Sequence, residues 1–154
     1  MKNVIITALL SITCMASFTY AADGAIVNPH GSSPHGSGVG PVDIGDVNVT
    51  KAVGQNAFTV AEIIDQSASL KDKQVSVRGK VVKFSPEIMN KNWIHLRDGS
   101  GSADGKNNDL VITSKGLTKV GSVVTLKGTV RTSKDFGHGY NYDVLLEDAT
   151  IIGK

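Results

Sequence analysis

Five short segments in which apolar and polar residues alternate constrain the fold of this chain more than any other feature. Alternation with a period of two places the apolar side chains on one face of a β-strand. Gly, Asn, Asp and Ser residues, which are typical of turns, separate the segments. The chain is therefore predicted to be all-β, with strands at residues 74–84, 93–97, 109–113, 122–130 and 142–147, the last continuing through 149–152.

Two of the predicted strands resemble each other and carry a glycine in the middle. Their sequences are VSVRGKVV, which contains Gly79, and VTLKGTVR, which contains Gly128. Glycine weakens the interior of a strand, so at these places it indicates a bulge or a sharp bend. Five strands with two bends predict a small closed barrel of the OB type. A flat sandwich, which more often has about seven strands, is the alternative.

A short helix is predicted before the strands. Thr59 and Glu62 have the spacing of a capping box, in which each side chain bonds the exposed backbone amide of the other. Val60, Ile63 and Ile64 fall on one face of the segment that follows. We expect the helix to end near residue 67.

The first 21 residues have the plan of a secretory signal peptide. Lys2 precedes an apolar run of about a dozen residues, and small residues follow near Ala21. The run is shorter than the roughly 20 residues that span a bilayer as a helix, so we expect cleavage and no membrane anchor. Export predicts a periplasmic location. Cleavage would also remove Cys14, the only cysteine, and leave no disulfide and no thiolate.

Residues 22–54 are predicted to form a flexible linker rich in Gly, Ser, Pro and His. Such a stretch buries too little apolar surface to offset the entropy of ordering it. It contains two Pro-His-Gly units, whose histidines are His30 and His35. They are either capture ligands for a metal or simply part of a low-complexity linker. Residues 55–154 are predicted to form one OB-fold domain.

Three runs of the sequence carry a family resemblance: GKVVKF from Gly79, IMNKNWIHLRDG from Ile88, and KGTV from Lys127. They resemble a family of small exported bacterial OB-fold proteins, and the resemblance covers residues 58–154. Members are often labelled as nucleic-acid-binding, and some accompany genes for periplasmic cytochrome c nitrite reductase. The resemblance implies the OB barrel, and a periplasmic cytochrome or redox protein as partner. It does not specify a ligand, because one fold serves many functions.

The second predicted strand offers a candidate ligand face. If its aliphatic residues fill the core, alternation turns Trp93, His95 and Arg97 outward. OB folds bind ligands on the outer face of strands two and three, between the loops that follow strands one and four. Met89 lies in the first of these loops. An extended chain would hold it about 20 Å from His95, so the chain must turn near residues 90–91 if Met89 is to approach Trp93.

A thioether, an imidazole and an indole face together suit a soft monovalent cation such as Cu(I). The set resembles the ligand types of the small OB-barrel copper chaperones of the bacterial periplasm, in a different order and spacing. The function expected is therefore a copper-type metal-binding chaperone or an accessory to a periplasmic redox enzyme. Ordinary packing of the same side chains is the alternative. The predicted metal ligands are Met89, His95, His138, His30 and His35.

Single-stranded nucleic acid or another polyanion is the second candidate ligand. Aromatic side chains would stack on bases, and basic side chains would hold phosphates. A formal net charge of only +2 and export to the periplasm speak against it. The ligand-face residues for either candidate are Trp93, Lys91, Arg97, Phe136 and Tyr140, with Tyr142, Lys83 and Lys134 added for the polyanion.

Catalysis is not expected, because the sequence contains no nucleophile elbow, phosphate loop or metalloprotease motif. The acid pairs Glu147–Asp148 and Asp104/Asp109 are expected to be solvated turn residues. The loop at residues 98–109 lacks the twelfth-position glutamate of a calcium loop. The protein is therefore expected to bind a ligand without transforming it.

Overall fold

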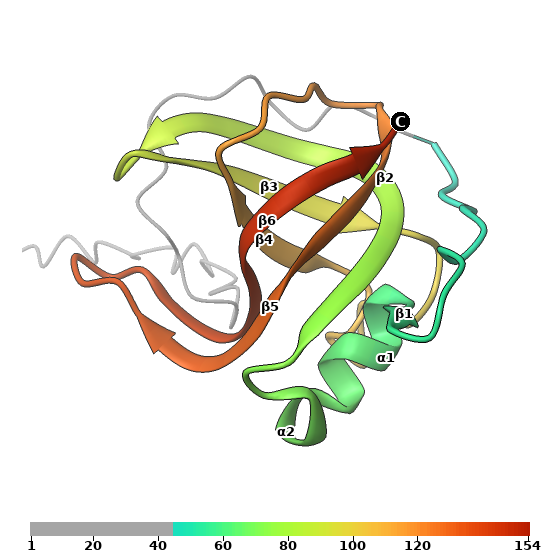
Figure 1. Ribbon diagram of the computed structural model, residues 1–154, viewed down its shortest axis with the longest axis horizontal. Helices are drawn as coiled ribbons and strands as arrows, with labels where there is room; N and C mark the ends of the chain where they lie inside the picture. Colours follow the sequence, from blue (N-terminus) through green and yellow to red (C-terminus); the bar gives the residue numbers. More distant parts are fainter. Residues whose placement is uncertain (1–44) are drawn as a thin grey trace, which may run out of the picture.

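The computed structural model describes residues 45–154, and within this range the chain is mostly β (Figure 1). Six strands form one mixed sheet, and two short helices stand before the first long strand. This confirms the prediction of an all-β chain with a short helix near its start. The elements are β1 (Ala57–Phe58), α1 (Val60–Asp65), α2 (Ser67–Leu70), β2 (Gln74–Ile88), β3 (Lys91–Arg97), β4 (Leu110–Ser114), β5 (Val123–Asp135) and β6 (Asn141–Gly153).

The sheet returns on itself. Its strand order is β1-β2-β3-β4-β6-β5, and β2 pairs with β5 as well as with β3. Two pairings, β1 with β2 and β4 with β6, are parallel, and the others are antiparallel. The long strand β2 makes the closure possible because residues 74–80 pair with β5 and residues 80–88 pair with β3.

The two mid-strand glycines lie where strands cross at close range. A Cβ atom on Gly79, next to the point where β2 changes partner, would stand 2.6 Å from the carbonyl oxygen of Arg97. A Cβ on Gly128 would stand 2.8 Å from Cγ of Leu146, and the β5–β6 register shifts at this point. Both positions require glycine because a side chain would collide with the neighbouring strand.

The hydrophobic core lies on the inner face of the curved sheet. Alternate residues of β2, β3 and β5 point inward, as the period-two pattern predicts. The α1 helix adds Val60 and Ile63, which are both fully buried. The buried cluster comprises Val60, Ile63, Leu70, Val75, Val77, Val81, Ile94, Leu96, Leu110, Ile112, Val124, Leu126, Val130, Leu146 and Ala149.

The capping box at the start of α1 is confirmed. The Thr59 hydroxyl accepts from the Glu62 amide at 3.1 Å, and the Glu62 carboxylate accepts from the Thr59 amide at 2.8 Å. Buried Asp98, at the end of β3, accepts from the Val60 amide at 2.9 Å and so fastens the helix to the sheet. The helical region breaks at Gln66 into two short helices, where a single helix is predicted.

The segment of residues 45–54 has no regular secondary structure but is attached to the rest of the fold. The Val49 amide donates to the Asp98 carbonyl at 2.9 Å, and Lys51 pairs with Glu62 at 2.6 Å. The folded part therefore begins earlier than residue 55, the boundary that composition indicates. Across residues 45–154, neither helix is long and apolar enough to cross a membrane.

Candidate functional site

Trp93 lies at the centre of an aromatic cluster on the outer side of β3. Its ring centroid is 5.2 Å from that of Phe136, 5.5 Å from that of Tyr140 and 5.3 Å from that of Tyr142. Phe136 and Tyr140 come from the β5–β6 loop, and Tyr142 comes from the start of β6. They leave Trp93 only 4% exposed. The outward direction of Trp93 is as predicted, but the expectation of an open indole face is wrong, because the β5–β6 hairpin covers it.

The β2–β3 turn is held against the same tryptophan. Trp93 Nε1 donates to the Ile88 carbonyl at 2.9 Å. Met89 and Asn90 follow with φ of 55° and 58°, between the paired residues Ile88 and Lys91. This is a two-residue turn of the kind that joins tightly paired antiparallel strands. The predicted turn is therefore confirmed, one residue earlier than expected. Met89 remains 41% exposed.

The loop between β5 and β6 brings an imidazole to the same end of the molecule. His138 is exposed, has a φ of 55°, and lies between Phe136 and Tyr140, which both pack on Trp93. Figure 1 shows the tips of the β2–β3 and β5–β6 hairpins on the same side, at the left. We call this region the hairpin end. It comprises the β2–β3 turn (residues 88–91) with Trp93, Phe136, His138, Tyr140 and Tyr142.

His95 belongs to a different cluster, at the other end of β3. Its Nδ1 is 2.8 Å from Oδ1 of Asp109, and Arg97 Nε donates to Oδ2 of the same carboxylate at 2.8 Å. Because an ionised carboxylate only accepts hydrogen bonds, Nδ1 of His95 carries a proton and donates it to Asp109. A carboxylate that fixes the ring in this way is the usual partner of a metal-binding histidine.

The charge of Asp109 is stabilised by this arrangement. Burial raises the pKa of the carboxyl group, but the hydrogen bonds and positive charges of His95 and Arg97 outweigh it and hold the pKa below its ordinary value of 3.8. The side chain is only 23% exposed. The expectation that Asp109 is a solvated turn residue is therefore wrong: it is the ionised centre of a three-residue cluster.

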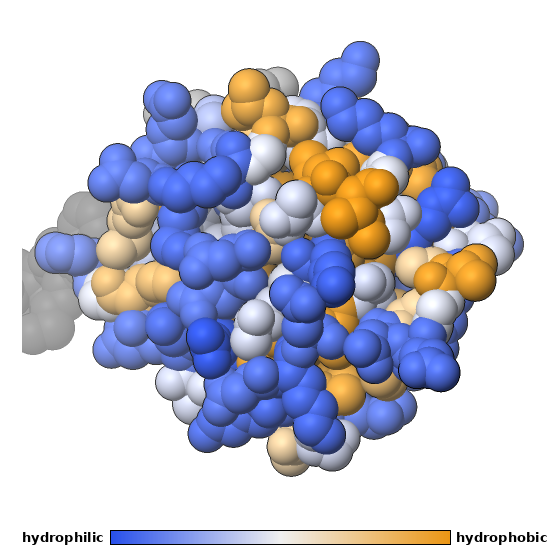
Figure 2. Space-filling model, viewed as in Figure 1, coloured by the Kyte–Doolittle hydropathy of each residue, from blue (hydrophilic) through white to orange (hydrophobic). Residues whose placement is uncertain are grey.

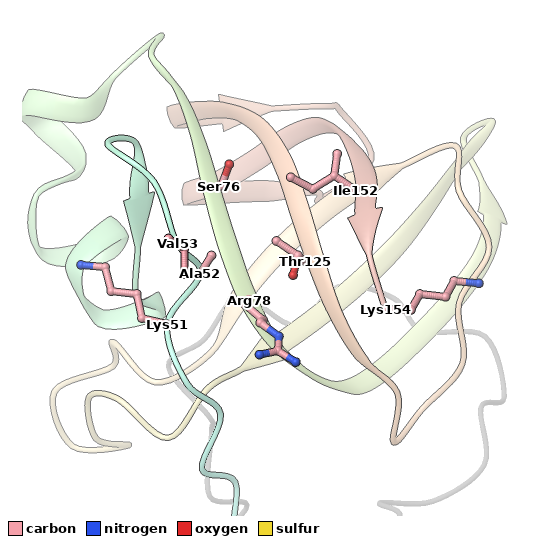
Figure 3. Close-up of a pocket in the computed structure, with 8 residues that line it drawn as sticks. All are labelled: Lys51, Ala52, Val53, Ser76, Arg78, Thr125, Ile152 and Lys154. Atoms are coloured by element: carbon pink, nitrogen blue, oxygen red, sulfur yellow. The ribbon is translucent and has the colours of Figure 1, made fainter.

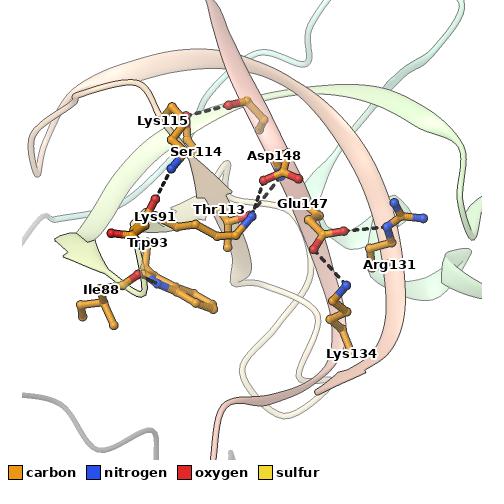
Figure 4. A network of polar contacts seen from close by, with 12 residues as sticks. Ile88, Lys91, Trp93, Thr113, Ser114, Lys115, Arg131, Lys134, Glu147 and Asp148 are labelled. Atoms are coloured by element: carbon orange, nitrogen blue, oxygen red, sulfur yellow. Dashed lines mark hydrogen bonds and ion pairs between the residues drawn. The ribbon is translucent and has the colours of Figure 1, made fainter. Parts of the chain in front are cut away.

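Further carboxylates of β6 neutralise lysines near the hairpin end (Figure 4). Lys91 Nζ is 2.5 Å from Oδ1 of Asp148, whose amide donates to the Thr113 hydroxyl at 3.0 Å. Lys134 Nζ is 3.1 Å from Oε1 of Glu147. Each of these lysines is therefore ion-paired with a carboxylate of the protein.

Glu147 has a second cationic partner. Arg131 Nε donates to its Oε2 at 2.8 Å, while Arg131 Nη1 reaches Asp72 at 2.5 Å. Burial raises the pKa of Glu147, and the hydrogen bonds from Arg131 and Lys134 outweigh this and lower it. The expectation of a solvated turn role is wrong for Glu147, which is buried. Asp148 is exposed, as expected.

The predicted metal ligands divide into separate groups. β3 is extended, so the Cα atoms of Lys91 and His95 are about 13 Å apart, and Met89 lies beyond Lys91 in the turn. Met89 shares the hairpin end with His138, whereas His95 is tied to Asp109. Among residues 45–154, no three side chains of the types His, Cys, Asp and Glu lie close enough together to bind a metal ion. This absence concerns those four residue types and does not cover sites that include a methionine ligand. His30 and His35 lie outside the described residues.

Two residues that hold these clusters together were not among the site residues predicted from the sequence. Asp109 precedes β4 and reaches His95 only because Leu96 of β3 is paired with Leu110 of β4. Buried Asn92 of β3 links the end of β2 to the loop after β4: its Oδ1 accepts from the Glu87 amide at 3.1 Å, and its Nδ2 donates to the Gly116 carbonyl at 3.0 Å. The contact between Asp109 and His95 could have been predicted from the register of β3 against β4, but alternation of apolar and polar residues does not by itself determine that register.

Comparison with known proteins adds no family to this description. No family model matches the chain, and no curated protein is significantly similar to it.

Proposed function

We propose that the protein is a non-enzymatic binding protein built on a five-stranded OB-type barrel, which works in the periplasm after its signal peptide is removed. The barrel is supported by the ring β2-β3-β4-β6-β5, in which every strand has two hydrogen-bonded neighbours and β5 pairs back to β2. The OB type is supported by the parallel pairing of β4 with β6, which are the third and fifth of these five strands in chain order. Export rests on the composition of the first 21 residues, which lie outside the described range.

The ligand is a soft monovalent cation such as Cu(I), bound at the hairpin end. The observation that supports this is the convergence of two loops on Trp93, one carrying the thioether of Met89 and the other the imidazole of His138. Thioether and imidazole are ligands that suit copper. Both side chains are exposed, and the turn and the loop that carry them are held by contacts with the buried ring.

A site with one sulfur and one nitrogen ligand leaves the ion open to a further donor. Such an ion is accessible to a ligand of another protein, so the site suits delivery of the metal better than its permanent storage. The proposed partner is therefore a periplasmic cytochrome or other redox protein that receives the metal. The chain itself acts as its chaperone or accessory.

Nucleic acid fits the hairpin end less well. The aromatic rings that would stack on bases instead contact one another, and Trp93 and Tyr140 are 4% and 9% exposed. Three of the basic side chains that would hold phosphates are ion-paired: Lys91 with Asp148, Arg97 with Asp109 and Lys134 with Glu147. Single-stranded binding needs free ring faces and an unneutralised basic groove.

An anaerobic competition titration with a chromophoric Cu(I) chelator tests the metal site. The protein without its signal peptide is compared with the variant Met89→Ala/His138→Ala. We expect the variant to bind Cu(I) at least about tenfold more weakly. The matched control is His95→Ala, which removes an imidazole outside the hairpin end and is expected to retain the affinity. Adding His30→Ala/His35→Ala measures the contribution of the linker.

The outcomes separate the alternatives. If His95→Ala weakens Cu(I) binding and Met89→Ala/His138→Ala does not, the metal site is at His95 and the hairpin end is rejected. Equal affinity in all variants rejects a metal site at any of these residues. A labelled oligothymidine, tested at low and high salt, measures the polyanion alternative: tight, salt-sensitive binding that is lost in Lys91→Gln would replace the metal proposal.

A further inference from the structure

An open groove of about 280 Å³ lies on the outer side of β2 and β5, where the segment before β1 and the end of β6 approach them (Figure 3). In Figure 1 this segment and the end of β6 lie at the right, away from the tips of the two hairpins. The groove belongs to none of the clusters described above. It is lined by Lys51, Ala52, Val53, Ser76, Arg78, Thr125, Ile152 and Lys154.

The cations at this groove are not neutralised as those near the hairpin end are. Within residues 45–154, neither Arg78 and Lys154, which line the groove, nor Lys127, which lies next to it on β5, forms an ion pair with a carboxylate of the protein. Lys51 is the exception, because its ammonium group is 2.6 Å from Glu62. Figure 3 shows Lys51 extended away from Arg78, whose guanidinium group lies between the Lys51–Val53 segment and the end of β6.

Strand register places two of these cations side by side. Arg78 is opposite Thr125, and Ser76 is opposite Lys127, so Arg78 and Lys127 are diagonal neighbours on one face of the β2–β5 pair. Such neighbours are about 7 Å apart at the backbone. Two like charges at that spacing repel each other, and an anion bound between them would remove the repulsion. Two hydroxyl groups, from Ser76 and Thr125, face the same groove.

Exposed apolar side chains flank the charges and indicate the kind of anion. Val53 is 100% exposed and Ile152 is 56% exposed, and both line the groove. No aromatic residue is among the described residues that line it, so it offers no platform on which a base could stack. In the view of Figure 2, polar side chains cover most of the surface and apolar ones form separate small patches, which a lipid surface would not favour.

From the unpaired cations and their apolar neighbours, we infer that this groove binds an acidic peptide segment of a partner protein. Carboxylates of the segment pair with Arg78 and Lys127, and an apolar side chain packs between Val53 and Ile152. The groove is separate from the hairpin end, so the partner is held while the hairpin end remains accessible. The inference does not depend on the proposed metal site, and the residues that test it are different.

Fluorescence polarisation with a short labelled peptide that alternates Asp and Glu with Leu tests this inference. We expect binding at low salt that weakens as salt is added, because exposed charges are screened. The variant Arg78→Gln/Lys127→Gln should bind about fivefold more weakly, the effect of losing one or two exposed ion pairs. The charge-matched control is Lys71→Gln/Lys106→Gln, which removes two exposed cations that neither line the groove nor lie on β2 or β5.

Further probes separate this partner from other anions. The same peptide with Asn and Gln in place of the acids should not bind, and Val53→Ser/Ile152→Ser should weaken binding of the acidic peptide. Equal losses in the groove variant and the charge-matched control would show unspecific attraction and overturn the inference. Stronger binding of oligothymidine, or of vesicles with anionic lipid, through Arg78 and Lys127 would overturn it as well. The Cu(I) variant Met89→Ala/His138→Ala should bind the peptide unchanged.

Discussion

The hairpin end with its adjoining strands and the groove over β2 and β5 present basic residues in opposite ways. In the first region, the cations Lys91, Arg97 and Lys134 are paired with carboxylates at 2.5 to 3.1 Å. At the groove, Arg78 and its diagonal neighbour Lys127 have no such partner among residues 45–154. Basic residues on neighbouring strands therefore do not mark a binding surface by themselves. The position of carboxylates on other strands decides which of them are available to a ligand.

Apolar groups follow the same division. The aromatic rings of the hairpin end cover one another, whereas Val53 and Ile152 of the groove remain open to solvent. We therefore expect substitutions of the packed rings and paired charges in the first region to lower stability, and substitutions in the groove to leave it almost unchanged. Three experiments test this contrast, in order of decreasing effect.

Replacing the central ring should have the largest effect. Trp93→Ala removes a 4% exposed indole with three ring contacts and should lower the free energy of unfolding by about 3–5 kcal/mol. Ile152→Ala in the groove should change it by less than about 0.5 kcal/mol. Urea unfolding measures both. Trp93 is the only tryptophan, so the wild-type emission should also be that of a buried indole. Emission typical of an exposed indole would contradict the cluster.

The Asp109 cluster should give an intermediate effect that depends on pH. Asp109→Asn should lower the free energy of unfolding at neutral pH by about 2 kcal/mol, because it weakens the hydrogen bonds of His95 and Arg97 to a charged acceptor. The exposed residue Asp104 provides the matched control, Asp104→Asn, with no change expected.

The sign of the pH dependence follows from the lowered pKa of Asp109. Its stabilisation is fully present above the unfolded pKa, near 3.8, and is lost as the pH falls through the lower folded pKa. Urea midpoints at about pH 5 and pH 2.5 should therefore differ more for the wild-type protein than for Asp109→Asn. Equal differences would mean that the pKa of Asp109 is the same in the folded and unfolded states.

The smallest effect should distinguish a paired from an unpaired cation. Lys91→Gln removes an ion pair whose Asp148 side chain is 65% exposed and should cost about 0.5 kcal/mol of stability. Arg78→Gln removes a charge that only repels Lys127 and should raise stability by a few tenths of a kcal/mol at low salt. Thermal melts at low and high salt measure both changes. A loss of stability in Arg78→Gln would mean that Arg78 has an anionic partner.

Much of the local structure follows from short stretches of the sequence. The alternating segments predict all five long strands, and the spacing of Thr59 and Glu62 predicts where α1 begins. Gly79 and Gly128 predict bulges or bends, and the β5–β6 register does shift at Gly128, but the close approach of neighbouring strands at both glycines was not predicted. The strands and the start of α1 could be predicted because they depend on side-chain periodicity and on hydrogen bonds between residues close together in the sequence.

The residues of the candidate site were only partly predictable. The outward direction of Trp93 and the turn beside Met89 follow from alternation and turn composition. The burial of Trp93 could not be predicted in this way, because the rings that cover it lie more than 40 residues later in the sequence. The same holds for His95, whose partner Asp109 is 14 residues away.

The sequence by itself determined which residues form strands, which face of each strand is apolar, and where glycine is needed. The tertiary structure decided strand register and the folding of the β5–β6 hairpin over β3, and with them the separation of Met89 from His95. It also decided which cations lie near carboxylates and left Arg78 and Lys127 without one among the described residues. The physical reason is that alternation acts between neighbours, whereas register and charge pairing depend on residues far apart in the chain.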